Sequence, residues 1–359
     1  MSEITLTAVQ AILDQTLDPE TGRAMGPMGQ IQDVQVDDNK ISYSVGITSC
    51  MWAIGDEVRD GINDRLTAAF PGAAINATIV PHERPPARIG QLGLRVKKVV
   101  LVGSGKGGVG KSTVAASLAV MLNQMGSRVG LMDADVYGPS VPHLLGLEGR
   151  PEVDADKKIR PIELREGFPV MSMGFLVEPD QAVIWRGPML HGSIQQFLRD
   201  TQWGELDYLI IDMPPGTGDI ALTLSQSVPI SGAVVVCTPQ EVALLDAVKA
   251  INMFRKVNIP VAGMVENMSG FLCPDNGKTY DIFGRGGARD KAAQMDVPFL
   301  GGLPIDIRLR EAGDEGRLHE VIADQPDAAA PIEQAARALV RHLASKAASE
   351  GVSTSLPTL

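Results

Sequence analysis

The spacing of apolar residues changes near residue 95, and this change divides the chain into two parts. In the first part, alternating runs typical of half-buried strands lie between stretches with apolar residues at helical spacing. They predict a helix, two strands joined by a turn at residues 37–39, a second helix and a last strand: TLTAVQAILDQTL from Thr5, IQDVQV from Ile31, KISYSVGIT from Lys40, IGDEVRDGINDRLTAAF from Ile54 and AINATIV from Ala74. We therefore expect a small α+β domain over residues 1–82.

The stretch PHERPPARIGQLG, which follows Val80, is rich in proline and basic residues. Such a composition is typical of a connection rather than of a packed element. We expect residues 83–95 to be a linker.

From residue 96 the apolar runs become continuous and alternate with helical stretches. Seven of them predict strands: VKKVVLVG, RVGLMDAD, PVMSMGF, DYLIIDM, GAVVVCTP, VAGMVENM and PFLGGLP. Continuous apolar strands separated by helices indicate an α/β fold, with a mostly parallel sheet covered by helices on both faces. Ligands are then expected at the carboxyl ends of the strands. We assign this domain to residues 96–345 and expect the small, polar residues 346–359 to form a disordered tail.

Composition narrows the function classes. The 359-residue chain is 44% hydrophobic, enough for a sizeable core, and its formal net charge of −11 argues against a general nucleic-acid binder. No apolar run is long enough to span a membrane, and the last helical stretch does not end as a basic amphipathic anchor, so we expect no membrane partner. Three widely spaced cysteines and the absence of a signal-peptide pattern favour a reducing cytoplasm.

The most informative motif is GSGKGGVGKST, which begins at Gly103 directly after an apolar run. It matches the phosphate-binding pattern G-x-x-x-x-G-K-[ST] at the start of a predicted helix. In such a loop the backbone N–H groups surround the phosphates, the lysine reaches the β- and γ-phosphates and the hydroxyl binds Mg²⁺. The sequence therefore predicts a P-loop NTPase fold with ATP and Mg²⁺ as ligands. We expect the nucleotide to contact Gly105, Gly107, Gly108, Val109, Gly110, Lys111, Ser112 and Thr113.

A P-loop also needs carboxylates at the ends of neighbouring strands. Asp212 ends the run DYLIID, and Gly216 follows closely enough for its N–H to sense a γ-phosphate. Asp133 and Asp135 end another run. We assign Asp133 and Asp212 to Mg²⁺ and Asp135 to orienting the attacking water, with a helix cap or turn as the alternative role for each aspartate.

The stretch GKGGVGKST resembles the deviant Walker A loop of the MinD/ParA/ArsA-like ATPases, in which a lysine also follows the first glycine. That lysine is Lys106 in this chain. The resemblance implies that Lys106 reaches the nucleotide of a partner subunit and assists catalysis there. The alternative is a solvated surface lysine.

A denser resemblance links residues 96–345 to the Mrp/ApbC family of iron–sulfur cluster carriers. It rests on LMDADVYGPSVPHLLG, IWRGPM, DYLIIDMPPGTGDIALTLSQ, CTPQEVALLDAVKAINMF and GMVENMSGF. The first 82 residues resemble, through DPETG, an iron–sulfur-assembly domain fused to such carriers. The family implies a homodimer with slow ATP hydrolysis that delivers clusters to apo iron–sulfur proteins and contacts assembly factors. It also implies a [4Fe–4S] cluster held by one Cys-x-x-Cys pair from each subunit.

This chain departs from the family pattern at the cluster ligands. Cys273 stands at the first position of the pair, but Asn276 stands at the second, and a neutral amide oxygen is a poor ligand for iron. Two functions therefore stay open: a cluster carrier, and a nucleotide-switched partner-binding protein that holds no cluster. Cys50 fits a functional thiol or a buried apolar residue equally well, and Cys237 lies in an apolar run and is expected in the core.

Two further side chains have alternative roles. Asn267 ends an apolar run at the place where related ATPases recognise adenine, and its amide would either bind the adenine edge or cap the following loop. Arg186 would serve the dimer, the cluster loop or a structural ion pair.

Overall fold

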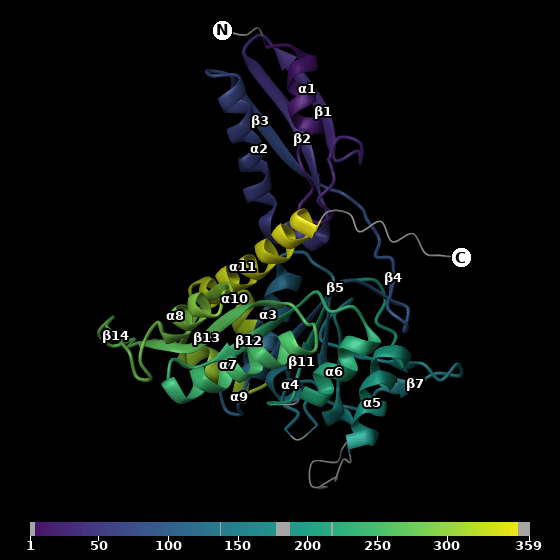
Figure 1. Ribbon diagram of the computed structural model, residues 1–359, viewed down its shortest axis with the longest axis vertical. Coiled ribbons are helices and arrows are strands. Elements are labelled where there is room, and N and C mark those ends of the chain that lie inside the picture. Colours follow the sequence, from purple (N-terminus) through teal and green to yellow (C-terminus); the bar gives the residue numbers. More distant parts are fainter. Residues whose placement is uncertain (1–3, 137, 177–186, 217, 351–359) are drawn as a thin grey trace. The chain divides into compact units, whose positions relative to one another are not determined.

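The first 85 residues and the end of the last helix form one unit of the computed structural model, and residues 86–339 form the other. The structure describes residues 4–136, 138–176, 187–216 and 218–350 (Figure 1). Within these residues, no helix combines the length and the apolar character that crossing a lipid bilayer requires. Arg186 lies outside the described residues.

The N-terminal unit has the α+β elements that the alternating pattern predicts. The three strands lie in the order β1-β2-β3, with β1 and β2 antiparallel and β2 and β3 parallel. The Thr5 side chain caps the first helix by accepting from the Ala8 N–H. The bounds are α1 Leu6–Asp14, β1 Ile31–Asp37, β2 Lys40–Ile47, the 3-10 helix η1 Ser49–Ile54, α2 Gly55–Ala69 and β3 Ala74–Pro81.

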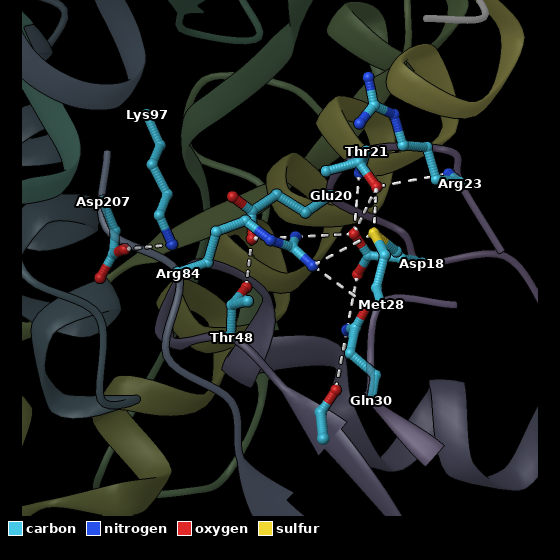
Figure 2. Close-up of polar contacts among 11 residues, drawn as sticks. Asp18, Glu20, Thr21, Arg23, Met28, Gln30, Thr48, Arg84, Lys97 and Asp207 are labelled. Carbon is cyan, nitrogen blue, oxygen red and sulfur yellow. Dashed lines mark hydrogen bonds and ion pairs between the residues drawn. The ribbon is translucent and has the colours of Figure 1, made fainter. Parts of the chain in front are cut away.

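Arg84 holds the loop after α1 against the end of the small sheet. Its guanidinium lies 2.8 Å from Asp18 and 3.2 Å from Glu20, and it donates to Gln30 at 3.1 Å (Figure 2). Glu20 in turn accepts a hydrogen bond from the Thr48 hydroxyl. Asp18 is 1% exposed, so the arginine compensates a carboxylate that water does not reach. Arg84 belongs to the predicted linker but is fixed within this unit.

The second unit is built on one mostly parallel sheet, which confirms the predicted fold class. Its order is β14-β13-β12-β5-β11-β6-β10-β9, with β15 beside β13 and β4 beside β5. All seven predicted strands are present, and the pairs from β13 through to β10 are parallel. The main strands are β5 Leu94–Gly103, β6 Val129–Asp133, β10 Pro169–Ser172, β11 Leu206–Asp212, β12 Gly232–Cys237, β13 Val261–Leu272 and β15 Phe299–Ile305. The short strands are β4 Arg88–Ile89, β7 Glu152–Val153, β8 Ile159–Arg160, β9 Ile162–Glu163 and β14 Thr279–Tyr280.

Helices flank this sheet (Figure 1). The helix after the P-loop, α3, is buried along Val114–Leu122 because it packs on β5, β6 and β11 and is also covered by α4 and α10. The helices are α3 Lys111–Gln124, α4 Val141–Leu145, α5 Gly187–Asp200, α6 Gly218–Ser227, α7 Glu241–Lys256, α8 Gly287–Gln294, α9 Ile307–Asp314, α10 Leu318–Asp324, α11 Pro326–Glu350 and the 3-10 helix η2 Met173–Phe175.

The end of α11 corrects one expectation. The tail was expected from residue 346, but the helix continues to Glu350. The reason is that Lys346-Ala347-Ala348-Ser349-Glu350 contains mainly strong helix formers. The rest of the expected tail, residues 351–359, lies outside the described residues.

An ion pair is buried near the start of β11. Lys97 of β5 lies 3.1 Å from Asp207, and both side chains are shielded from water (Figure 2). Asp207 also accepts the Arg128 N–H at 2.8 Å. The charges at this end of the strand are therefore used to hold β5 and β11 together, whereas the opposite end carries Asp212.

We predict that Arg84→Met destabilises the N-terminal unit by about 2–4 kcal/mol, because Asp18 and Glu20 lose their common cation. Thermal unfolding of the full chain, with amide hydrogen exchange of residues 16–30 as the local readout, measures the effect. Arg59→Met is the matched control, since its partners Asp56 and Asp60 have side chains 64% and 61% exposed. Equal effects of the two substitutions would contradict this role of Arg84.

Candidate functional site

Three parallel strands end side by side and bring the predicted site residues together. Asp212 at the end of β11 is the register partner of Asp133 on β6 and of Val102 on β5. The P-loop leaves β5 and enters α3 at Lys111. Residues more than 100 positions apart in the sequence therefore meet at one edge of the sheet.

The P-loop backbone depends on its glycines for separate reasons. Gly108 and Gly110 have φ angles of 78° and 77°, which residues with a Cβ rarely adopt. Gly105 is needed for close packing, because a Cβ there would lie 2.0 Å from the backbone oxygen of Asp246 on α7. The loop conformation is thus fixed by its own sequence and by α7.

The loop borders two cavities. One, of about 240 Å³, is lined by the predicted residues Lys106, Gly107, Gly108, Gly110, Lys111, Ser112, Thr113 and Asp135, together with Ser104, Gly138, Ser140 and Pro215. The other, of about 360 Å³, shares Gly110 and Thr113 and is lined by Asn267 of β13. Gly105 and Val109, which also belong to the loop, line neither cavity. Lys106 is only half-buried on the wall of the first cavity.

The central interaction of the site joins Lys111 and Asp212. The Lys111 Nζ lies 2.6 Å from Asp212 Oδ1 and 3.7 Å from Asp135 Oδ2, and it donates to Ser112 Oγ at 3.2 Å. Burial raises the pKa of Asp212, and the Lys111 charge opposes that rise. Among the described residues, the other carboxylate oxygen, Asp212 Oδ2, is buried without a hydrogen-bond partner. A buried oxygen of this kind beside a hydroxyl suits a hard cation such as Mg²⁺.

Asp133 and Asp135 occupy different positions. Asp133 is fully buried, and it accepts from the Asp135 N–H at 3.0 Å, the Val141 N–H at 3.3 Å and the Ser172 hydroxyl at 3.0 Å. Burial, and secondarily the charge of Asp212, raise the pKa of Asp133 to about 7. Asp135 lines the cavity, whereas Asp133 lies behind it. The sequence predicts that Asp133 binds Mg²⁺. In the structure, both carboxylate oxygens of Asp133 instead accept hydrogen bonds from the protein.

Gly216 and Asn267 contact the P-loop backbone. The Gly216 N–H donates to the Ser104 carbonyl at 3.2 Å, so this N–H is engaged with the loop rather than directed only at a ligand. The Asn267 Nδ2 donates to the Val109 carbonyl at 2.9 Å. Both contacts join strands β11 and β13 to the loop between β5 and α3.

Cys273 lies in the turn between β13 and β14. Its N–H donates to the Lys278 carbonyl at 2.9 Å, and its side chain is partly exposed. The Asn276 amide is used inside the same turn, where Oδ1 accepts the Lys278 N–H at 2.9 Å and Nδ2 donates to the Tyr280 hydroxyl at 3.2 Å. Asn276 thus shapes the turn.

The two other cysteines are buried. Cys237 is 1% exposed in the core of the sheet, as predicted, and burial raises its pKa to about 12. Cys50 is fully buried in the N-terminal unit, which favours the second of its two interpretations, a packed apolar residue. In the described residues no group of three or more His, Cys, Asp or Glu side chains is arranged to hold a metal ion.

Sequence reasoning missed one wall of the larger cavity. Pro304, Asp306 and Arg310, which come at and after the end of β15, line it together with P-loop residues. The Asp306 carboxylate caps α9 by accepting from the N–H groups of Arg308 and Leu309. The signal was present in PFLGGLPID, where an aspartate follows an apolar run.

Two family models match this chain. The model of the NUBPL iron-transfer P-loop NTPases matches residues 95–344, and the model of an iron–sulfur cluster assembly protein matches residues 6–79. An iron–sulfur cluster carrier protein of Deinococcus radiodurans is 47% identical over 343 residues, covering 94% of each chain. The iron–sulfur cluster transfer protein NUBPL of mouse is 51% identical over 233 residues, covering 64% of this chain and 72% of that protein.

Solved structures agree with the fold. A nucleotide-binding protein from Archaeoglobus fulgidus in complex with ADP is 43% identical, with a TM-score of 0.56, over 63% of this chain and 88% of that one. The cell division ATPase MinD of Pyrococcus furiosus is 23% identical, with a TM-score of 0.50, over 67% of this chain and 97% of that one. The second likeness concerns the fold alone.

The raised pKa of Asp133 predicts a pH-dependent effect of Asp133→Asn. Between the unfolded pKa near 4 and the folded pKa of about 7, the unfolded chain loses this proton first, so ionisation of Asp133 lowers the stability of the wild type as pH rises. Asparagine does not ionise. The stability of the variant relative to wild type should therefore increase by about 2 kcal/mol from pH 5 to pH 8 and then level off.

Urea unfolding without nucleotide or Mg²⁺ measures this difference. Comparing the two proteins at each pH removes the contributions of His82, His319 and His342, whose pKa values burial lowers in both. A difference that does not vary with pH would show that Asp133 is ionised in the folded protein throughout this range.

Proposed function

Because the chain belongs to the family of NUBPL iron-transfer P-loop NTPases, we propose that it is a nucleotide-dependent carrier that delivers iron–sulfur clusters to apoproteins. As a P-loop NTPase it binds and hydrolyses a nucleoside triphosphate. The slow rate of hydrolysis, the homodimer and the held cluster are parts of the proposal.

One observation carries the proposal. Strand β13 borders the nucleotide cavity at Asn267 and ends at Leu272, directly before the turn that contains Cys273. A phosphate-binding loop and a partly exposed thiol are thus joined by one strand within one unit. This arrangement supports a cargo site under nucleotide control.

The first cavity is the proposed triphosphate site. Backbone N–H groups of residues 107–113 and the N-terminus of α3 would bind the phosphates. Lys111 would exchange Asp212 for the β- and γ-phosphates, since phosphate charge replaces carboxylate charge beside its ammonium group. Ser112 would hold Mg²⁺ together with Asp212 Oδ2, which has no hydrogen-bond partner in the part of the chain that the structure describes, and the ion would neutralise phosphate charge. The larger cavity would take the nucleoside, with the Asn267 amide at the adenine edge.

Hydrolysis needs a positioned water and a cation for the charge that develops in the transition state. Asp135 is the carboxylate on the cavity wall, so we assign it to orienting the water that attacks the γ-phosphorus as the bond to the β–γ bridging oxygen breaks. Asp133 positions the backbone of Asp135 through its hydrogen bond to that N–H. Lys106 of a second subunit would stabilise the transferred phosphoryl group, as an arginine finger does.

The cargo site would form between two copies of Cys273. A homodimer offers two thiolates from these turns, and iron–sulfur clusters prefer thiolate ligands. Because Asn276 is engaged by Lys278 and Tyr280, the remaining ligands of a [4Fe–4S] cluster would come from outside these turns. Such a cluster would be held less tightly than one with four cysteines, which suits transfer to an apoprotein.

A second function is favoured by the same Asn276 contacts. If the turn keeps its shape without a metal, the protein would act as a nucleotide-switched partner-binding protein in iron–sulfur assembly and hold no cluster. Its partners would then be assembly factors bound by either unit. The sequence pattern favours neither nucleic acid nor membrane as a partner, and its cysteine content favours the cytoplasm.

We predict that Lys106→Ala keeps nucleotide affinity within about threefold but lowers the rate of ATP hydrolysis at least 100-fold and abolishes ATP-dependent dimer formation. Calorimetry, phosphate release and light scattering measure the three quantities. Lys111→Ala is the comparison variant and should lose nucleotide binding itself. Unchanged turnover in Lys106→Ala would contradict the contribution of the second subunit.

We predict that cluster content depends on Cys273 and rises when the second cysteine is restored. Iron and labile sulfide analysis after anaerobic reconstitution should find little of either in Cys273→Ala, and more in Asn276→Cys than in wild type, because thiolates replace an amide. Transfer to an apo iron–sulfur protein is the functional readout.

Wild type and Cys273→Ala that behave alike in this assay, while Lys111→Ala loses function in cells, would favour the partner-binding protein. Iron and sulfide that remain bound to Cys273→Ala would place the cargo site elsewhere.

A further inference from the structure

We infer that Asn267 is a positioning residue that ties the P-loop to the strand bearing Cys273, so that a bound nucleotide alters the mobility of the cysteine turn. The inference rests on the proposed function, which supplies the bound nucleotide. It adds a structural connection from the nucleotide cavity to the Cys273 turn within the second unit. It assigns to the Asn267 amide a backbone contact in addition to adenine recognition.

The contact itself is close and well defined. The Asn267 Nδ2 donates to the Val109 carbonyl at 2.9 Å, across 158 positions of sequence. The next residue, Gly110, passes so near that a Cβ there would lie 2.2 Å from the same nitrogen. The amide is therefore held between the P-loop backbone and the cavity that Gly110 and Asn267 share.

A nucleoside in that cavity would compete with this contact. The side-chain amide has two N–H donors and one carbonyl, and its orientation toward Val109 fixes where all three point. Turning the amide toward the edge of a base changes or breaks the bond to Val109. Nucleotide binding is then linked to the release of β13 from the P-loop.

The strand beyond Asn267 is built irregularly, which lets such a change reach the turn. Met268 has a φ of 58°, a conformation that costs free energy for a residue with a Cβ. The pairing of β13 with β15 shifts register between Asn267 and Phe271. Phe271 and Leu272 then pair with β14, and Cys273 follows in the turn.

These features form one continuous path. A hydrogen bond joins the Val109 carbonyl of the P-loop to the Asn267 amide, and Met268 and the rest of β13 lead from there to the Cys273 turn. The Asn267 amide would bind either the Val109 carbonyl or the edge of a base, and the irregular strand after it would pass this change on to the Cys273 turn. This part of β13 therefore couples nucleotide binding to the environment of the thiol.

The test measures the rate at which N-ethylmaleimide alkylates Cys273 in the full chain, followed by mass spectrometry of the Cys273 peptide. Cys50 and Cys237 are 0% and 1% exposed and serve as internal references. Mg²⁺·ADP is the probe, because it lacks the γ-phosphate that Lys106 is proposed to reach in a second subunit. Calorimetry gives the ADP affinity of each protein, so that all rates are compared at saturation.

In wild type, saturating Mg²⁺·ADP should raise the alkylation rate of Cys273 at least threefold. Asn267→Asp keeps the size of the side chain but removes its donors, so Cys273 should react fast without nucleotide and respond less than 1.5-fold to it. Ser269→Ala is the matched control on the same strand, since Ser269 lines neither nucleotide cavity, and it should behave as wild type.

Several results would overturn the inference. If wild type binds ADP but the Cys273 rate does not change, the coupling is absent while the proposed function stands. If Asn267→Asp reacts slowly and still responds to ADP, another residue carries the coupling. If wild type does not bind ADP, the proposed function and the inference both fail.

A second measurement keeps the test independent of the variants. Amide hydrogen exchange of residues 271–280 in wild type should accelerate at least threefold with Mg²⁺·ADP, because the turn includes the bond from the Cys273 N–H to the Lys278 carbonyl. Unchanged exchange with ADP bound would overturn the inference even if Asn267→Asp does not fold.

Discussion

The buried charge of Lys111 is the constraint around which the active end of the sheet is organised. A lysine side chain that is 6% exposed needs an anion beside its ammonium group, and Asp212 supplies one at 2.6 Å. That pairing requires β11 to end beside the loop that leaves β5, which in turn requires the parallel register of the two strands. The same requirement explains why Gly105 tolerates no side chain, because it must pass close to α7 for Lys111 to enter its helix where it does. The Lys111–Asp212 pair therefore links the register of β5 and β11 to the position of the lysine that the P-loop provides for phosphate.

Three carboxylates share this small region, and the environment of each suits it to a different task. Asp212 keeps one oxygen for Lys111 and one without a hydrogen-bond partner among the described residues. Asp135 lines the cavity, whereas the carboxylate of Asp133 accepts hydrogen bonds that hold the backbone at Asp135. Burial raises the pKa values of both Asp133 and Asp212, and a neighbouring carboxylate adds to each rise, Asp212 in the case of Asp133 and Asp135 in the case of Asp212. A cation brought in with a triphosphate relieves that repulsion, so the site is prepared for a charged complex rather than for a neutral ligand.

Much of this could be predicted from the sequence because strand ends and glycine spacing are local signals. The apolar runs located the seven main strands, and the G-x-x-x-x-G-K-[ST] pattern located the loop. The family resemblance was confirmed by the match over residues 95–344. The hydrogen bonds that engage Asp133 were not predictable, because one of them comes from Ser172, a tertiary neighbour 39 positions away. The hydrogen bond from Asn267 to Val109 was not predictable either, since a contact between residues 158 positions apart does not affect the spacing of apolar residues along the chain. The engagement of Asn276 depends on the geometry of a turn that the sequence CPDN does not reveal by itself.

The self-sufficient turn around Asn276 has a consequence for how the protein could change over time. In many metal-binding loops the metal supplies the cross-link that gives the loop its shape, so losing a ligand residue unfolds the loop as well. Here the amide of Asn276 performs the cross-linking through Lys278 and Tyr280, so loop shape and metal affinity are separate properties. A change at Cys273 would then alter the affinity of this turn for a metal, while the bonds of Asn276 keep the form of the surface that a partner protein meets.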